Sequence, residues 1–304
     1  MSAASKKVIY AALVGNALIA VIKFIASTVT GSSAMLSEGI HSLVDTGNQV
    51  LLLVGIKRSK RPPGPDFPYG HGKEVYFWSF VVAILIFAVG AGISIYEGIK
   101  HLLHPAQLEN PTINYIVLGL AMLFEGIAWS VALKEFRKVK GSLGYFEAVK
   151  RGKDPTMFVV LFEDSAAMLG LVAAFAGILL SQLTGIVQFD AIASIIIGLI
   201  LGGTAVWLAV ETQSLLIGES ASHDVVEGVR RLASECACVE HVNEVLTMHM
   251  GPEYILVNIS MDFRDEMLVG QLEREIAAMD RAIKTTYPEV RRIFIEAEAA
   301  GRKQ

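Results

Sequence analysis

The sequence has little charge and almost no cysteine. Charged residues make up 18% of the 304-residue chain and hydrophobic residues 53%, which departs from the composition of an average soluble domain. This composition favours a membrane protein. The two cysteines, Cys236 and Cys238, are too close in sequence to bridge one another easily, so we expect no disulfide framework. We interpret them as two small buried side chains, with a soft metal site as the alternative.

Proline is absent from the interior of six apolar segments of the sequence. Each segment is long enough for the roughly 20 residues that a transmembrane helix requires. The first follows Lys6 and Lys7 and is longer than the apolar core of a signal peptide, so we expect it to be retained. The segments cover residues 8–29, 34–56, 75–99, 113–133, 156–180 and 189–216. We predict a six-helix transmembrane domain over residues 1–216.

Basic residues gather in two of the loops between these segments. The loop after the second segment carries Lys57, Arg58, Lys60, Arg61 and Lys73, and the loop after the fourth is also rich in lysine and arginine. The loops on the opposite side contain Lys100 and little else that is basic. By the positive-inside rule, the basic loops and both chain ends face the cytoplasm. We expect a multi-pass protein of the bacterial inner membrane.

The composition changes after residue 216. A helical segment is followed by HVNEVLTMHM and EYILVNISMDF, in which polar and apolar residues alternate as they do in strands. A second helical segment ends before Pro288, and RRIFIEAEA is typical of a last strand. The order αββαβ predicts a ferredoxin-like α+β domain over residues 217–304, on the cytoplasmic side.

The second apolar segment carries four polar side chains, namely Glu38, His41, Asp45 and Asn48. At 3.6 residues per turn, this spacing puts all four on one face of a helix. Ionisable groups at membrane depth are costly and mark ion pathways. A histidine and an aspartate four residues apart, as at His41 and Asp45, can hold one metal ion between them. The segment therefore predicts half of a metal site.

The fifth apolar segment supplies further acids at Glu163 and Asp164. Together with His41 and Asp45 they give one imidazole and three carboxylates, enough for tetrahedral coordination of zinc, manganese or iron(II). Cobalt and cadmium are further candidates. Because neighbours on a helix point about 100° apart, we favour Asp164 as the ligand and Glu163 as a fourth ligand or a proton acceptor. The alternative is that the acids are merely structural.

Other polar residues in or near the segments are weaker signals. Lys23 lies near a helix end, where we expect it to extend toward the membrane interface. Glu125 lies in the middle of the fourth segment and is interpreted as a supporting group or a proton relay. Asp190 opens the sixth segment, where an acid is favourable at a helix N-terminus. Asp66 and His71 in the first basic loop are read as solvated side chains, with a second metal site as the alternative.

The motifs HSLVD in the second segment and YGHGKE before the third, with six spans and an αββαβ tail, resemble the cation diffusion facilitator family. The resemblance implies a homodimeric, proton-coupled exporter of divalent metals, mostly zinc. It places the family's second-helix ligands at His41 and Asp45 and the fifth-helix aspartate at Asp164. The other fifth-helix ligand falls on Val160, which cannot coordinate a metal.

The sequences HSLVDTGNQ and LFEDSAA look like a divergent branch of the family, one that includes the animal mitochondrial zinc transporter. In that branch Glu163 would substitute for the ligand missing at Val160. The resemblance also implies dimerisation through the tail. Asn243 and Asn258 stand where family members often bind further metal, so we expect no metal sensor in the tail.

We therefore predict an antiporter that exports zinc from the cytoplasm and is not an enzyme. Metal binds deprotonated His41, Asp45 and Asp164, and protons displace it on the opposite face, because each ligand must lose its proton to bind metal. The alternative is an intramembrane metal-dependent hydrolase, with Glu163 as its general base. A non-transporting scaffold is a third option. The expected partners are lipid, the metal ion, protons and a second copy of the chain, without nucleic acid.

Overall fold

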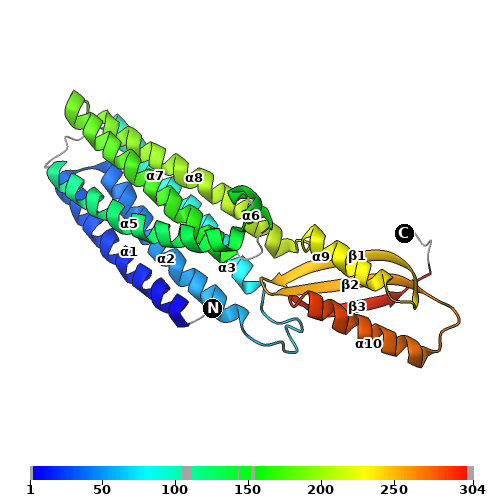
Figure 1. The fold of residues 1–304 in the computed structure, drawn as a ribbon. Helices are drawn as coiled ribbons and strands as arrows, with labels where there is room; N and C mark the ends of the chain where they lie inside the picture. The colour runs from blue at the N-terminus through cyan, green and yellow to red at the C-terminus, as the bar shows by residue number, and fades with distance from the viewer. Residues whose placement is uncertain (1–2, 105–110, 143, 152–154, 300–304) are drawn as a thin grey trace. The chain divides into compact units, whose positions relative to one another are not determined.

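The computed structural model describes residues 3–104, 111–142, 144–151 and 155–299. The chain divides into two compact units, a helical unit and a unit built around a sheet (Figure 1). The helical unit comprises Met1–Lys57, Val75–Lys150 and Asp154–Gln213. The sheet unit comprises Arg58–Glu74, Arg151–Lys153 and Ser214–Gln304.

Long helices build the helical unit, because its apolar segments have no internal proline to interrupt them. A π-helical stretch, η1, interrupts the third segment, and such stretches are frequent at functional sites. With α3 and α4 it forms one continuous helical rod from Glu74 to Leu103. The elements are α1 (Ala3–Thr30), α2 (Ser33–Ser59), α3 (Glu74–Leu85), η1 (Ile86–Ala91), α4 (Gly92–Leu103), α5 (Pro111–Lys140), α6 (Tyr145–Arg151), α7 (Pro155–Thr184) and α8 (Gln188–Ile217).

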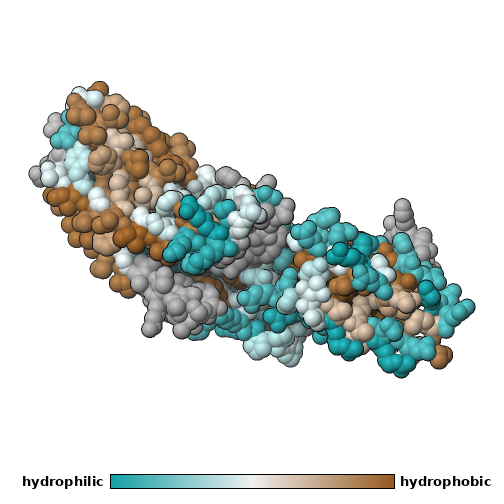
Figure 2. Space-filling view, viewed as in Figure 1, coloured by the Kyte–Doolittle hydropathy of each residue, from teal (hydrophilic) through white to brown (hydrophobic). Residues whose placement is uncertain are grey.

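Five helical stretches in the described chain are long and apolar enough to cross a membrane. They are Leu13–Thr30, Glu74–Leu103, Thr112–Lys138, Phe158–Thr184 and Gln188–Ile217. Large apolar side chains on these stretches remain exposed, such as Leu18 at 61% and Leu199 at 62%. Figure 2 shows apolar residues gathered over the helical unit. Apolar surface of this extent is typical of a bundle that faces lipid.

α2 is long enough to span a bilayer at 27 residues, yet it is not among these apolar stretches. The predicted second span carries its polar residues on the inside of the unit, where Glu38, His41, Asp45 and Asn48 are all buried. These four side chains lower the apolar character of the helix. The number of stretches identified by length and apolar composition is therefore five, one fewer than predicted.

Small residues bring the rod formed by η1 and α4 into close contact with α8. A methyl group at Gly98 would come within 2.9 Å of the carbonyl oxygen of Ala191, and one at Gly198 within 3.0 Å of the carbonyl oxygen of Ala91. Only hydrogen at the Cα positions permits this approach of the two backbones. The two helices therefore pack through small residues, as membrane helices commonly do.

The sheet unit contains α9 (His223–Ser234), β1 (Val239–Gly251), β2 (Tyr254–Phe263), α10 (Val269–Thr286) and β3 (Val290–Ala297). This element order is the predicted αββαβ. The sheet order is β1-β2-β3, with β1 and β2 antiparallel and β2 and β3 parallel (Figure 1). Val257 and Ile259 of β2 are fully buried in a core to which Val229 of α9 and Ile283 of α10 contribute, whereas Asn258 between them is exposed. Both helices thus cover the same face of the sheet.

Cys236 and Cys238 form a disulfide, so the prediction of two unbridged side chains was wrong. They lie where the chain leaves α9 and turns into β1. This turn brings their Cα atoms to 5.2 Å, inside the range that a disulfide requires. Sequence separation alone did not reveal the turn.

The first basic loop packs within the sheet unit. Lys73 Nζ donates to the carbonyl oxygen of Leu216 at 3.4 Å, and Gly72 lies so close to the backbone of Met250 that a methyl group there would clash. His71 of the same loop stacks on Phe67, with ring centroids 4.4 Å apart. The loop is therefore a packed part of this unit rather than a free connection.

Candidate metal centre

The polar face of α2 is anchored at its N-terminal end by Asp190 of α8. One carboxylate oxygen, Oδ2, accepts hydrogen bonds from the backbone N–H groups of Ser33 at 2.7 Å and Ala34 at 3.3 Å, and Oδ1 accepts one from the Ser32 hydroxyl at 2.6 Å. An acid at this position satisfies free N–H groups and complements the helix dipole. Asp190 lies in the first turn of α8, as expected, but it caps the neighbouring helix.

His41 and Asp45 lie one turn apart on this face and are almost fully buried. His41 Nδ1 is 3.3 Å from Asp45 Oδ1, although the two atoms do not have the alignment of a hydrogen bond. In the described structure, both ring nitrogens of His41 and Oδ1 of Asp45 have no hydrogen-bond partner. Buried polar atoms are nearly always paired, so these three unpaired atoms stand out, and they are of the nitrogen and oxygen types that bind metal ions.

Glu163 of α7 connects α7 to the polar face of α2. Asn48 Nδ2 donates to Glu163 Oε1 at 2.6 Å, and the carboxyl groups of Glu163 and Asp45 lie close enough to interact electrostatically. Two carboxyl groups this close to one another favour a state in which one of them carries a proton.

Asp164 lies on the same helix, partly buried, and interacts electrostatically with Asp45 and Glu163. Glu163 rather than Asp164 is thus the acid that contacts α2 directly. Within the described part of the chain, no three side chains of His, Cys, Asp or Glu are arranged to hold a metal ion together. The predicted residues lie in one acidic region, with His41 and Asp45 as a close pair and Glu163 and Asp164 beside them. In the described structure they do not form a complete coordination shell.

Lys23 does not extend to the membrane interface, and that prediction was wrong. Its side chain is 1% exposed, and Nζ lies 3.0 Å from Glu38 Oε2 and 2.8 Å from Ser42 Oγ. The ammonium group stays inside because a buried carboxylate and a hydroxyl on α2 satisfy it there. The sequence feature that could have indicated this ion pair is a lysine in one apolar span and a glutamate, Glu38, in the next.

Glu125 of α5 belongs to the same buried region. Its side chain is 3% exposed, and it interacts electrostatically with Asp45, Glu163 and Asp164. Among the described side chains of the helical unit, several carboxylates are buried, whereas Lys23 is the buried lysine or arginine. An acidic interior of this kind attracts cations.

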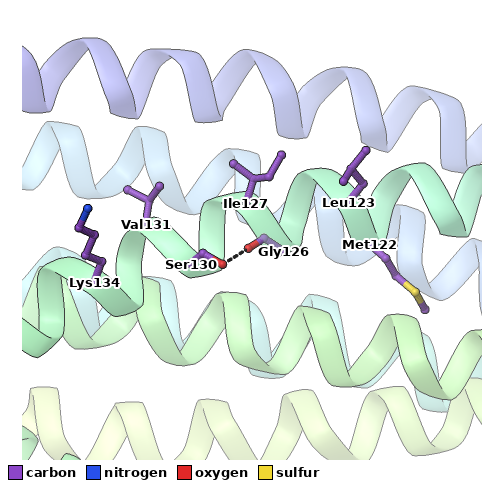
Figure 3. A pocket seen from close by; sticks show the side chains of 7 residues that line it. All are labelled: Met122, Leu123, Gly126, Ile127, Ser130, Val131 and Lys134. Atoms are coloured by element: carbon purple, nitrogen blue, oxygen red, sulfur yellow. Dashed lines mark hydrogen bonds between the residues drawn. The ribbon is translucent and has the colours of Figure 1, made fainter.

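A hollow on the side of α5 is separate from this region. Its volume is about 450 Å³, and most of its lining is apolar. Figure 3 shows its lining side chains along the one helix, with the Ser130 hydroxyl donating to the carbonyl oxygen of Gly126 at 2.7 Å. The lining residues are Met122, Leu123, Gly126, Ile127, Ser130, Val131 and Lys134. The hollow contains no acid or histidine, so it does not fit a cation.

Comparison with known proteins places the helical unit in a family. Residues 9–217 match the model of the cation efflux transmembrane domain. The chain is 37% identical over 260 residues to the mitochondrial proton-coupled zinc antiporter of Xenopus laevis, a match that covers 84% of this chain and 46% of that protein. It is 30% identical to metal tolerance protein C4 of Arabidopsis thaliana, over 87% of this chain and 58% of that protein.

A third relative is the manganese efflux system protein MneP of Bacillus subtilis, which is 23% identical over 96% of this chain and 95% of that protein. The chain spans about half the length of the zinc antiporter from Xenopus. The matched family and these relatives are transporters rather than enzymes, which argues against an intramembrane hydrolase. The chain is a multi-pass integral membrane protein. From residue 9 to residue 217 it belongs to the cation efflux family, the cation diffusion facilitators.

Proposed function

We propose that this protein is a proton-coupled antiporter that exports divalent metal cations, zinc first among them, from the cytoplasm. The observation that carries the proposal is the set of buried ligand atoms without partners, both ring nitrogens of His41 and Oδ1 of Asp45. The zinc antiporters among the relatives support the same cargo. The proposed ligands are His41, Asp45 and Asp164, with Glu163 as a further ligand or a proton acceptor.

Proton coupling follows from the chemistry of these ligands. Asp45 and Glu163 are neighbouring buried carboxyl groups, so one of them would hold a proton that a metal ion has to displace. When metal leaves toward the opposite side of the membrane, the same carboxyl groups can take a proton back. Rocking of the helices around the site would expose it to each side in turn. Asp164, which interacts with Asp45 electrostatically, would complete the metal shell in one of these states.

The imidazole of His41 favours a transition metal over magnesium or calcium, which prefer shells of oxygen atoms. Manganese is the main alternative to zinc, because a relative that matches nearly the full chain is named as a manganese efflux protein. Iron(II), cobalt and cadmium suit the same mixture of nitrogen and oxygen ligands. Isothermal titration of each metal into the purified protein would rank them.

The proposed topology has six spans, with α2 as the span whose polar face lines the transport site. Its length of 27 residues and its buried position within the helical unit support this assignment. We propose that residues 1–216 form the membrane domain and residues 217–304 a ferredoxin-like domain in the cytoplasm. The basic loops support an orientation with both termini on the cytoplasmic side. The near full-length match to a Bacillus protein supports a bacterial inner membrane.

We also propose that the protein is a homodimer joined through its sheet domain. Leu246, Asn258 and Phe294 lie in register across β1, β2 and β3 on the face away from the helices. Leu246 is 53% and Phe294 40% exposed, so this face presents apolar side chains that a second copy would cover. The dimer would rest on strand and side-chain packing rather than on metal ions.

Zinc flux into proteoliposomes under a pH gradient tests the transport proposal. We expect His41→Ala and Asp45→Ala to reduce flux by at least about 100-fold, since each removes a proposed ligand. His101→Ala, which removes an imidazole at the end of α4, is the matched control and should keep the flux of the unmodified protein. Gel filtration of each variant would establish that it is folded. Full flux in both His41→Ala and Asp45→Ala would overturn the proposal.

A further inference from the structure

Lys23 is a buried cation beside the proposed metal ligands. Nζ is held by Glu38 Oε2 at 3.0 Å and by Ser42 Oγ at 2.8 Å. These two acceptors stand on either side of His41 in the sequence of α2. The ammonium group therefore lies against the helix that carries the proposed site, at the level of its imidazole.

Burial strengthens the field of this charge. Lys23 is 1% and Glu38 0% exposed, so little water screens their interaction with neighbouring groups. The positive charge of Lys23 acts on His41 of α2 and also on Glu125 of α5. Among the lysines and arginines whose side chains the structure describes, Lys23 is the buried one. It is thus a fixed cation within an otherwise acidic interior.

The partner of Lys23 is held firmly in place. Glu38 packs against Gly170 of α7, where a methyl group would come within 2.5 Å of Glu38 Oε1. Glu38 therefore lies between α1 and α7, where it neutralises Lys23. The ion pair links α1 to α2 and adds no net charge to the region.

We propose that Lys23 is a positioning residue, a tethered cation that weakens divalent-metal binding at the adjacent site and keeps Glu38 from acting as an extra ligand. This inference rests on the proposed transport function. Without the positive charge, Glu38 would add to the carboxylates around His41, and the ion would bind more tightly and leave more slowly. Without Glu38, the uncompensated ammonium group would repel the ion.

Two charge-removing substitutions, of which Glu38→Gln is isosteric, separate this role from simple structural pairing. Lys23→Gln removes the positive charge but keeps N–H donors for Glu38 and Ser42, and Glu38→Gln removes the negative charge but keeps an acceptor. The double variant restores a neutral, hydrogen-bonded pair. Lys23→Arg retains the charge and serves as the conservative control. All four keep a polar group at each position, which protects folding.

Zinc titration of the full-length purified protein, with zinc flux measured in parallel, tests the inference. We expect Lys23→Gln to tighten zinc binding at least about tenfold, with a lower KM and a lower maximal flux, because a unit charge acts strongly on a divalent ion at this depth. Glu38→Gln should weaken zinc binding by a similar factor. The double variant and Lys23→Arg should bind zinc within about threefold of the unmodified protein.

The outcomes are distinguishable. Opposite shifts in the two single variants support the tethered-cation role. If both single variants weaken binding, or neither changes it, while the unmodified protein binds and transports zinc, the inference is wrong and the transport proposal stands. If the unmodified protein neither binds nor transports a divalent metal, the proposed function fails and the inference fails with it. If one single variant does not fold, the neutral double variant still tests the inference, because a tenfold change in its zinc affinity would contradict it.

Discussion

The two units of the molecule bury different kinds of side chain. The sheet unit encloses a core of aliphatic residues, in which Val257, Ile259 and Ile283 are fully buried. The helical unit encloses carboxylates, an imidazole and an ammonium group, several of whose atoms lack hydrogen-bond partners in the described structure. An aliphatic core serves folding alone, whereas unpaired polar atoms cost stability and are retained where they bind something. The sheet unit is therefore stabilised by an ordinary aliphatic core, whereas the helical unit contains the polar groups of the proposed metal site.

The largest effect is expected from the aliphatic core. Ile259→Ala should lower the free energy of unfolding of the sheet unit by about 3 kcal/mol, because it removes a fully buried side chain and leaves a cavity. Zinc affinity should change by less than about twofold, since the change creates no charge near the proposed site. Chemical denaturation followed by far-UV circular dichroism measures the free energy of unfolding, and zinc titration measures the affinity. A large loss of zinc affinity would break the division between the two units.

Asp190 tests a polar contact whose role is structural. Asp190→Asn leaves the amide oxygen as an acceptor for the α2 N-terminus but removes the negative charge and one acceptor atom. We expect the free energy of unfolding to fall by about 2 kcal/mol, because charge-assisted hydrogen bonds to buried N–H groups are the strong ones. Thermal unfolding in detergent would measure the change. Glu97→Gln, at a partly exposed ion pair near the end of α4, is the matched control and should have little effect.

Glu163 tests a polar contact whose proposed role is functional. Glu163→Gln keeps a hydrogen-bonding group for Asn48 but cannot exchange a proton with Asp45. We expect zinc affinity to fall about tenfold and fewer protons to be released per zinc ion bound, with little loss of stability. Calorimetric titration in buffers of different ionisation enthalpy measures both quantities. Glu298→Gln, which alters a carboxylate hydrogen-bonded to Ser260 in the sheet unit, is the control. Unchanged proton release in Glu163→Gln would contradict the role.

The smallest effect concerns Tyr254 at the start of β2. Partial burial raises the pKa of its phenol above the ordinary value of 10.0. A group whose pKa is higher in the folded state contributes stability below its unfolded pKa and loses it as the pH rises through the folded pKa. As the pH rises above about 10, the sheet unit should therefore lose slightly more stability than the Tyr254→Phe variant does. Thermal unfolding across this range measures the difference, and identical slopes would contradict it.

Local patterns predicted much of this structure from sequence. The spacing of Glu38, His41, Asp45 and Asn48 depends only on helical geometry, and the structure does bury all four on one side of α2. The alternation of polar and apolar residues in β1 and β2 likewise predicted the order of elements in the sheet unit. These features follow from residues that are close together in the chain.

Contacts between distant segments were not predictable in this way. Asp190 reaches the N-terminus of α2 from 157 residues away, and Lys23 finds Glu38 on the neighbouring helix. The disulfide between Cys236 and Cys238 depends on the turn after α9. Whether Glu163 or Asp164 faces α2 depends on how α7 is rotated, which the sequence pattern leaves open. Each of these outcomes is decided by the packing of elements rather than by local periodicity.

X-ray absorption spectroscopy of the protein loaded with one equivalent of zinc tests the central claim most directly, that the polar face of α2 holds the transported metal. The account predicts a shell of one imidazole and oxygen ligands, with the imidazole signal lost in His41→Ala and retained in His101→Ala. A shell containing sulfur, or an imidazole signal that persists unchanged in His41→Ala, would place the metal elsewhere in the molecule and contradict the account.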